Sequence, residues 1–557
     1  MAKKEKYRSG KYIIITNNLS VFCFFNDIKK IKCLNLEEKI TTRKNLTFYK
    51  YYYKQFLTTL KKIGSNKYFE LKFNKRDNLN WLFSIYKYKP MQEYAAFNRY
   101  YILLKAFIKK KKINKLIVFN DFSSLAFLDK EDYIKLNNFI ASELNINFEV
   151  INIKSQKKYF YNLDHIEILK INLKYIISIF KNLYSKLKIN FDNKFELIAT
   201  LQPYYELKYF NIPYKFIIFR ELDYIIEKIK YRLANKKIEL TPADYNKIKD
   251  LKNFYSQNIA QEIVLEKILT HFSSNINFYR NYCLKIKKKL EKNNIKKVIW
   301  GMPPANPDLR LALISYLKSN NFKIIGIQHG GCYGDQNYDL LQILTDYLNC
   351  NTFYSYENFK VNYSKNLFKS KDIAKIKKKG SLKQKFYSKN YFRNFEPKNI
   401  LYAITHWTRS SIVFPGVTPK YMHDLQKQIL NLLNKNQKKS TVVKFSKSFS
   451  NIQDDSIYPG HLLVKKFNNF IIESKKNLID SINFYKPELI ILDTYTTTLH
   501  ETYNTKSEII CFLDKGSPVK NSFKRIYSKR VHFVENINQF KDILKKYQNN
   551  KLIRKAQ

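Results

Sequence analysis

The sequence predicts an α/β protein made of two units, each built on a parallel β-sheet covered by helices. Three observations predict this fold class. Short apolar, β-branched runs alternate with longer segments of helical spacing, as in strands joined by helical crossovers. A lysine-rich stretch at residues 369–385, interpreted as a linker, separates two such series. The chain has 557 residues, which is too long for one hydrophobic core and favours two or three domains.

The first series of strands occupies the N-terminal part of the chain. Its apolar runs lie at residues 11–17, 115–121, 148–152, 297–301 and 323–327. Between the third and fourth runs the pattern changes to long helical stretches, which predicts a helical insertion over about residues 162–292. We therefore expect an N-terminal domain over residues 1–390 that contains this insertion.

The second series begins after the lysine-rich stretch. Its strand-like runs lie at residues 399–406, 441–445, 488–493 and 507–513. Helical spacing separates them, which predicts parallel strands joined by crossover helices. We expect a second domain over residues 391–557, with a ligand site in the cleft between the two domains.

Glycine is scarce but locally concentrated. The chain has 11 glycines, and none lies between Gly64 and Gly301. A concentration of glycine indicates positive φ angles or close backbone approach. Five of the eleven gather around the fifth strand of the first series: Gly301, Gly326, Gly330, Gly331 and Gly334.

The strand at residues 323–327 runs into His329, which makes this histidine the candidate catalytic residue. Ligands of open α/β sheets bind outside the carboxyl ends of the strands. A histidine titrates near neutrality and suits a general base; a structural histidine in a tight turn is the alternative. The neighbouring loops predict an acceptor-side group of Gln328, Gly330, Gly331, Tyr333 and Asp308.

Three threonines mark a second candidate site. Thr496, Thr497 and Thr498 lie between a strand and a helix start, where free amides and hydroxyls favour phosphate binding. The alternative is that they only cap the helix. Glu501, one turn further, is placed to accept hydrogen bonds from a ribose. Three more donor-binding candidates follow the first two strands of this series: His406, Arg409 and Lys444.

The composition limits the kinds of binding partner that we expect. The formal charge of +55 would suit nucleic acid or an anionic membrane. The lysines are spread along the chain, however, and residues with A/T-rich codons are abundant throughout, so we expect no nucleic-acid partner. The six cysteines show no zinc spacing, which predicts no metal site and a reduced, cytoplasmic protein. No signal-type segment and no apolar run of about 18 residues occurs, which leaves at most peripheral contact with an anionic membrane.

Three segments occur in an order that resembles a known family. They are Gln-His-Gly-Gly-x-Tyr-Gly at residues 328–334, the acidic Asp346 before a strand, and Asp-x-x-x-Thr-Thr-x-x-Glu at residues 493–501. Over residues 295–515 the chain resembles bacterial transferases encoded in surface-polysaccharide clusters. It is more distantly similar to CDP-glycerol glycerophosphotransferases and other GT-B transferases.

The resemblance implies two Rossmann-like domains facing across a cleft, with a nucleotide-activated donor held mainly by the C-terminal one. It implies no cofactor and no obligatory metal. His329 maps onto a catalytic histidine, although this chain has Gly331 where the glycerophosphotransferases have threonine.

The expected function is transfer of a sugar or sugar-like group from a nucleotide-activated donor to an acceptor hydroxyl. The acceptor would be a glycan or lipid-linked molecule in cell-surface polysaccharide biosynthesis. A nucleotide-sugar epimerase, a basic nucleic-acid-binding protein and a non-catalytic glycan- or nucleotide-binding protein are the alternatives.

Overall fold

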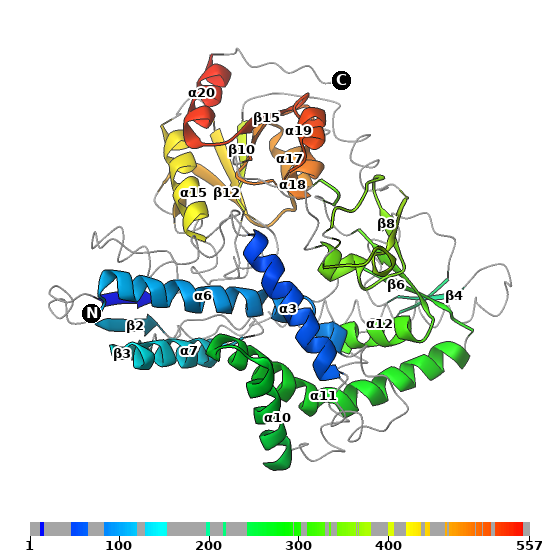
Figure 1. Ribbon diagram of the computed structural model, residues 1–557. Coiled ribbons are helices and arrows are strands. Elements are labelled where there is room, and N and C mark those ends of the chain that lie inside the picture. Colours follow the sequence, from blue (N-terminus) through cyan, green and yellow to red (C-terminus); the bar gives the residue numbers. More distant parts are fainter. Residues whose placement is uncertain are drawn as a thin grey trace, which may run out of the picture.

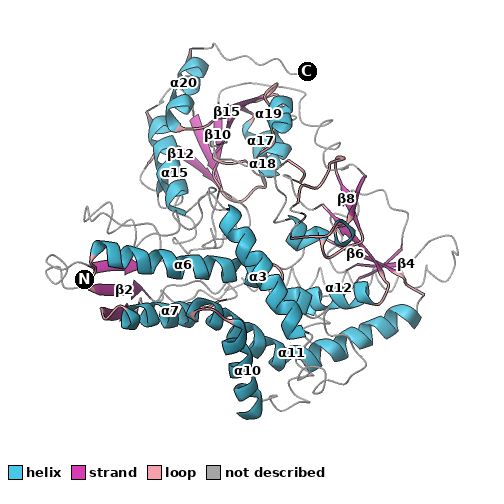
Figure 2. Ribbon diagram, viewed as in Figure 1, coloured by secondary structure: helices cyan, strands magenta, loops and turns pink. Residues whose placement is uncertain are grey.

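The computed structural model shows an α/β protein with three parallel sheets (Figure 1). The residues that it describes are 12–15, 46–64, 83–119, 128–152, 197–200, 215–218, 242–292, 294–301, 309–328, 333–335, 342–363, 365, 367–379, 399–405, 419–435, 440–445, 463–464, 467–495, 497–503, 505–513 and 519–549. Helices and strands alternate along most of this length (Figure 2), as the sequence predicts.

The first sheet has three strands in the order β1-β2-β3. They are β1 (Tyr12–Ile15), β2 (Lys115–Phe119) and β3 (Asn147–Ile151). α7 (Lys130–Glu143) packs on β2 and β3, α6 (Lys89–Lys111) packs on α7, and α3 (Leu46–Gly64) packs on α6. α7 begins at a capping box, in which the Asp129 carboxylate accepts from the N–H groups of Glu131 and Asp132, so the helix start is fixed by sequence.

The second sheet has six parallel strands in the order β5-β4-β6-β7-β8-β9. They are β4 (Leu197–Thr200), β5 (Lys215–Ile218), β6 (Lys297–Trp300), β7 (Lys323–Ile327), β8 (Thr352–Ser355) and β9 (Lys375–Lys378). The helices of this part are α10 (Pro242–Tyr255), α11 (Ile259–Lys292) and α12 (Leu309–Ser319), with a π-helical turn η5 (Ile343–Tyr347) and a 3-10 turn η6 (Ser370–Asp372). Another 3-10 turn, η3 (Ser84–Tyr86), precedes α6.

Three details of the first unit differ from the sequence prediction. Its strands form two sheets instead of one, because β1, β2 and β3 make a sheet of their own. Residues 162–292 contribute more than helices, because β4 and β5 belong to the second sheet. Apolar runs of four residues cannot be told from helix by periodicity, so both strands were missed. The predicted linker at 369–385 supplies β9, whose lysines lie at the sheet edge. An edge strand pairs on one side only and tolerates exposed charge there.

One hydrophobic cluster joins these two sheets. It extends from Ile13 to Ala374, and α11 packs against α6, α10 and α12 within it. Ion pairs reinforce the helix contacts, as where the Lys267 ammonium reaches the carboxylates of Asp129 and Asp132. We call residues 12–379 the first unit. The predicted boundary near residue 390 falls outside the described part of the chain and stays a prediction.

The third sheet forms the C-terminal unit, residues 399–549, and has the order β12-β11-β10-β13-β14-β15. Counted within the unit, this is 3-2-1-4-5-6, the order of doubly wound dinucleotide-binding folds. The strands are β10 (Asn399–Ala403), β11 (Ser440–Lys444), β12 (Phe470–Glu473), β13 (Pro487–Leu492), β14 (Glu508–Phe512) and β15 (Val531–Val534). β6 and β13 lie in different sheets, as expected for two separate series.

Helices cover both faces of this sheet. One face packs on α15 (Pro419–Asn434) and α20 (Ile537–Gln548), and the other on α17 (Leu478–Tyr485), α18 (Thr497–Thr502) and α19 (Asn521–Tyr527) (Figure 1). Successive side chains of β10 point to opposite faces of the sheet. Ile400 and Tyr402 belong to the hydrophobic cluster on the α15 and α20 face, and Leu401 and Ala403 belong to the cluster on the α17, α18 and α19 face. A strand buried on both faces is continuously apolar, which explains the apolar run in the sequence.

Glu473 ends β12 and is buried. Burial alone would raise the pKa of its carboxyl. Hydrogen bonds from the Lys476 and Lys475 backbone N–H groups and from the Lys476 ammonium outweigh burial and lower the pKa to about 2. The ionised form is therefore favoured in the folded protein.

We expect Glu473→Gln to destabilise the C-terminal unit by up to about 3 kcal/mol at pH 7. Because the pKa is lowered on folding, this contribution is present above the usual value of 4.5 and is lost as pH falls toward about 2. Urea unfolding of both proteins between pH 3 and 7 measures it. Asp542→Asn, at an exposed carboxylate of α20, is the control. A penalty that does not change with pH would contradict the lowered pKa.

In the segments that the structure describes, no helix combines the length and the apolar character needed to cross a bilayer.

Candidate functional site

The strand order of the C-terminal unit reverses between β10 and β13, and a buried carboxylate lies there. Asp493 directly follows β13 and is 2% exposed. Its Oδ2 accepts hydrogen bonds from the Tyr402 hydroxyl at 2.9 Å and from Gln426 Nε2 at 2.9 Å. Such reversal points open a crevice outside the carboxyl ends of the strands, where ligands of this fold class bind.

Asp493 also fixes the backbone that leaves β10. The Thr405 N–H group donates to both carboxylate oxygens, at 3.1 and 3.0 Å, and Gln426 Nε2 donates to the Thr405 carbonyl at 2.7 Å. Burial raises the pKa of Asp493, and the hydrogen bonds from Thr405, Gln426 and Tyr402 offset only part of that rise. The carboxylate therefore holds the two strand ends at the reversal point together.

In the first unit, the glycine-rich segment follows β7. Gly326 lies within this strand, and a Cβ there would come within 2.7 Å of the Phe353 ring and 2.8 Å of Cys350 Sγ. Close approach of β7 and β8 therefore requires a residue without a side chain, as the glycine concentration predicts. Gln328, one residue beyond β7, is buried. Its N–H donates to the Tyr354 carbonyl and its Oε1 accepts from the Tyr356 N–H, both at 2.9 Å.

Further along the segment, Tyr333 attaches the backbone to the rest of the first unit. Its hydroxyl donates to Asp346 Oδ2 at 3.1 Å, and its ring stacks on Phe353 at 5.4 Å. Burial and the neighbouring Asp346 carboxylate raise the pKa of Tyr333, so the phenol stays protonated and can donate. Gly334 then has φ of +79°, and a Cβ there would overlap the Phe359 ring. Gly326 is thus required for the close approach of two strands, and Gly334 for a left-handed backbone conformation.

The next residue, Asp335, contacts the C-terminal unit. Its Oδ2 accepts from the Tyr495 hydroxyl at 2.5 Å and lies 3.3 Å from His500 Nε2. Tyr495 follows β13, and His500 lies on α18. The segment that leaves β7 therefore meets the carboxyl end of β13.

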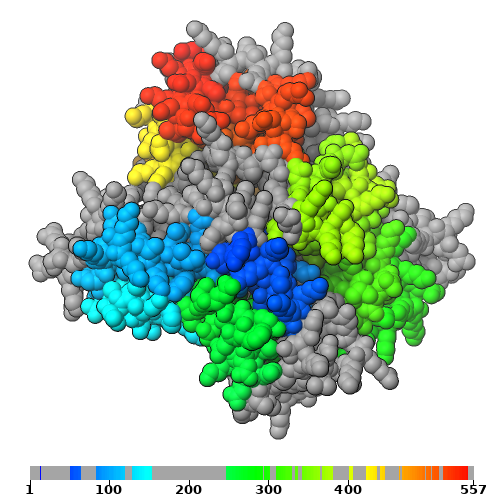
Figure 3. All heavy atoms as spheres, in the orientation of Figure 1, coloured from blue at the N-terminus to red at the C-terminus, as the bar shows by residue number. Residues whose placement is uncertain are grey.

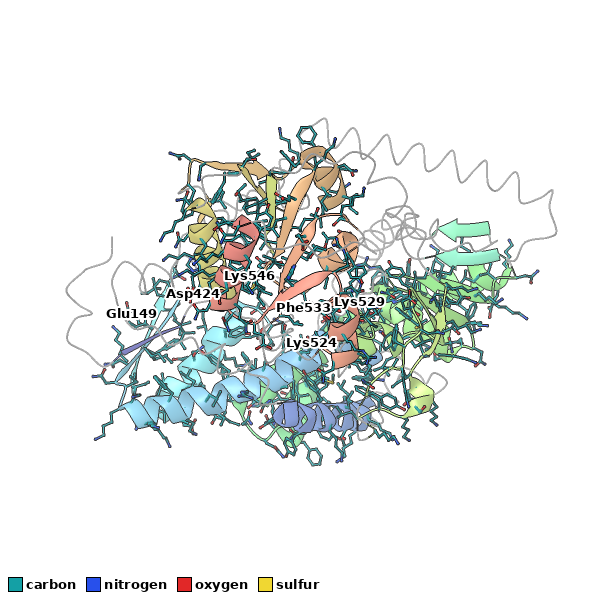
Figure 4. All side chains as sticks on the ribbon, turned by 90° about the horizontal axis from the view of Figure 1, so that it is seen from above. Glu149, Asp424, Lys524, Lys529, Phe533 and Lys546 are labelled. Carbon is teal, nitrogen blue, oxygen red and sulfur yellow. The ribbon has the colours of Figure 1, made fainter. Side chains whose placement is uncertain are left out.

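A second contact lies beside it. The Lys520 N–H donates to the Asp335 carbonyl at 2.8 Å, and the Lys520 ammonium donates to the Gly334 carbonyl. Lys520 precedes α19, the helix that carries Lys524 in Figure 4. Figure 3 shows the yellow-green residues of the first unit directly beside the orange residues of the C-terminal unit. Segments that follow the carboxyl ends of β7 and β13, in two different parallel sheets, thus meet, in keeping with the predicted GT-B fold.

Four of the predicted donor-side residues lie in the described part of the chain, at the same edge of the C-terminal sheet. On α18, Thr497 is exposed, and Thr498 and Glu501 are half-buried. Lys444, the last residue of β11, is buried and its ammonium donates to the Phe445 carbonyl. Only four residues separate the end of β13 from the start of α18, which places the first turn of α18 beside the reversal point.

Seven predicted site residues lie outside the described part of the chain, so their roles stay predictions. They are Asp308, His329, Gly330, Gly331, His406, Arg409 and Thr496. The described residues on either side of them constrain the site. Gln328 and Tyr333 bracket the segment with His329, and Thr405 precedes His406.

Sequence reasoning missed four residues of this region. It noted Asp493 only as a strand end and within a motif, and it assigned no role to Asp335, Tyr495 or His500. One signal was present, because the chain has eight histidines and His500 falls inside the threonine-rich segment. The pairing of Asp335 with His500 joins residues 165 positions apart, and no local pattern predicts it.

Among the residues that the structure describes, no three His, Cys, Asp or Glu side chains are grouped closely enough to hold a metal ion.

Comparison with known proteins gives distant structural similarity only. No family model and no curated protein sequence matches the chain. UDP-GlcNAc 2-epimerase from Neisseria meningitidis bound to UDP-GlcNAc is 12% identical, with a TM-score of 0.35 over 64% of this chain and 91% of that one. The Methanocaldococcus jannaschii enzyme in complex with UDP-GlcNAc and UDP is 13% identical, with a TM-score of 0.35 over 65% and 94%. The spinosyn rhamnosyltransferase SpnG complexed with thymidine diphosphate is 8% identical, with a TM-score of 0.29 over 64% and 92%.

Proposed function

We propose that the protein is a transferase that moves a sugar or sugar-like group from a nucleotide-activated donor to an acceptor hydroxyl. One observation carries this proposal. The loop leaving β7 meets the reversal point of a doubly wound sheet through Asp335, Tyr495 and His500. A nucleotide at the reversal point would therefore lie near residues 333–335, which follow the candidate base His329 closely in the sequence.

The residues supply the chemistry that such a transfer needs. A base must take the proton of the acceptor hydroxyl, and His329 is the candidate. The departing nucleoside diphosphate must be stabilised as negative charge develops on it. The amides and hydroxyls at the start of α18, with Arg409, are the candidates for that role, and Glu501 is the candidate partner of the ribose.

The biological setting is a proposal from the sequence resemblance. It places the enzyme in cell-surface polysaccharide synthesis, with a glycan or lipid-linked acceptor and peripheral contact with an anionic membrane. The related architecture of nucleotide-sugar epimerases makes epimerisation the alternative reaction. The two reactions differ in one respect, because an epimerase changes the sugar without any acceptor.

A thermal-stability screen tests the proposal. Binding to the native state raises its apparent stability, by about 2.7 kcal/mol when the ligand is at 100 times its Kd. We expect stabilisation by at least one of UDP, CDP, thymidine diphosphate or their sugar conjugates, and none by adenosine. Incubating the stabilising conjugate without acceptor then separates the reactions. An altered sugar still attached to its nucleotide would support the epimerase, and failure of every nucleotide would overturn the proposal.

The threonines of α18 give a sharper test. We expect the double substitution Thr497→Val and Thr498→Val to weaken nucleotide binding by about tenfold or more, since hydrogen bonds to a charged group are worth about 1.5–3 kcal/mol each. Valine keeps the approximate shape and removes the hydroxyls. Calorimetric titration measures the affinity, with Thr58→Val on the exposed surface of α3 as control. Unchanged affinity in the folded double variant would mean that the threonines only cap the helix.

A further inference from the structure

Asp335 is enclosed by side chains from the other unit. Its side chain is 20% exposed and that of His500 is 14% exposed. Tyr495 and His500 both approach the same oxygen, Oδ2. A solvent-exposed ion pair contributes little, but a hydrogen-bonded carboxylate shielded from water holds its partners much more firmly.

Aromatic rings fix the orientation of His500. The rings of Tyr495, Phe523 and Tyr527 lie 6.2, 6.3 and 5.5 Å from its ring. The Tyr527 hydroxyl lies 2.9 Å from Nδ1. If that hydroxyl donates to Nδ1, the proton of a neutral imidazole is on Nε2, which then donates to Asp335. Neutral His500 can therefore make both contacts.

The backbone on either side of Asp335 is held as well. The Lys520 N–H and ammonium bind the carbonyls of Asp335 and Gly334. On the other side, Tyr333 is bound to Asp346 within the first unit. The three residues 333–335 are thus attached to both units within a very short stretch of chain. A displacement of one unit relative to the other must be transmitted to this stretch.

We propose that Asp335 is a positioning residue, which holds the loop leaving β7 in place against the nucleotide-binding edge of the C-terminal unit. This inference rests on the proposed function for its catalytic meaning. It assigns Asp335 no contact with substrate. Asp335 acts through the loop that it anchors, and His500 and Tyr495 are its partners.

Four substitutions in the full-length chain test the inference. Asp335→Asn removes the charge. His500→Gln keeps an N–H donor near the position of Nε2, whereas His500→Asn places its amide near Nδ1 and leaves Asp335 without that donor. Tyr503→Phe is the matched control, because it removes a tyrosine hydroxyl beside α18 that faces the Ile526 carbonyl at 3.5 Å instead of Asp335.

Hydrogen exchange of peptides covering residues 333–335, followed by mass spectrometry without ligand, gives the first readout. We expect Asp335→Asn and His500→Asn to speed exchange there by about tenfold or more, while β13 peptides keep their rate. His500→Gln and Tyr503→Phe should match the wild type. Slow exchange in His500→Gln with fast exchange in His500→Asn is the pattern expected if an N–H donor at the Nε2 position holds Asp335.

The second readout is turnover of the nucleotide-sugar that the stability screen identifies. We expect kcat to fall about tenfold in Asp335→Asn and His500→Asn, with KM for the nucleotide-sugar unchanged. Unchanged exchange at 333–335 would overturn the inference, as would faster exchange with normal kcat. Faster exchange spread over both units with a lower Tm would also overturn it, because Asp335 would then be a general stability contact. If no nucleotide binds to the wild type, the proposed function fails, and the exchange readout still decides whether Asp335 anchors the loop.

Discussion

His329→Ala should lower turnover by about 10²–10⁴-fold while leaving nucleotide affinity unchanged, since that is the scale of general acid–base catalysis. A general base acts on the reacting proton and contributes little to donor binding. The wild-type activity should rise with pH near the pKa of a histidine, about 6.5, and the variant should lose that limb of the profile. Melting temperature, nucleotide affinity and turnover are measured on the same preparation.

A structural histidine would give a different pattern, and this chain contains one for comparison. His532 of β15 is buried, and its Nε2 lies 2.9 Å from Glu508 Oε2, at the amino edge of the C-terminal sheet. We expect His532→Ala to lower the melting temperature and to keep the pH limb. If His329→Ala lowered the melting temperature, the affinity and the turnover together, it would behave like His532. A stable His329→Ala variant with normal turnover would exclude both roles.

Asp493→Ala should destabilise the C-terminal unit by about 2–4 kcal/mol, because it removes the acceptor of several buried donors at once. The Tyr402 hydroxyl, the Thr405 N–H and one Gln426 N–H group would lose this partner. The start of the loop after β10 would also lose its attachment to β13. We therefore expect weaker nucleotide binding in addition to lower stability.

Urea unfolding, followed by a probe in the C-terminal unit, measures the effect. Asp542→Ala is the matched control, because Asp542 is an exposed aspartate in the same unit, where substitution should change stability by about 0.5 kcal/mol or less. An Asp493→Ala midpoint equal to that of the control would mean that water replaces the carboxylate without cost.

The sequence predicts four strands of the C-terminal unit and misses its two four-residue strands, β12 and β15. Strands such as β10 and β13 are continuously apolar and bounded by polar residues, so their existence and their parallel pairing follow from composition. β4 and β5 have four residues each and lack that length of signal. Their position beside β6, and the separation of β1–β3 into a sheet of its own, depend on packing that spans the whole first unit.

In the candidate site, too, local features could be predicted from the sequence and contacts between distant segments could not. Glycine concentration located the segment after β7, and the structure gives physical reasons at Gly326 and Gly334. The threonines located α18. The contacts between these segments could not be predicted, because Asp335 meets His500 only after two separate sheets have formed. The amide oxygen of Gln328 binds the backbone N–H of Tyr356. This contact is also long-range and could not be predicted, and the acceptor-side role of Gln328 stays a prediction.

The continuous hydrophobic cluster of the first unit bears on how the chain folds as it is synthesised. Ile13 and Ala374 belong to the same cluster, and α6 packs on α11, which begins only at Ile259. The first sheet therefore cannot bury its apolar surface until several hundred residues have left the ribosome. Among the residues that the structure describes, the clusters of the C-terminal unit draw only on Ile400 to Tyr547, so this later segment can form its core from its own residues. At synthesis rates of about 5–20 residues per second, the N-terminal strands therefore stay open to aggregation or chaperone capture for roughly twice as long as the C-terminal strands.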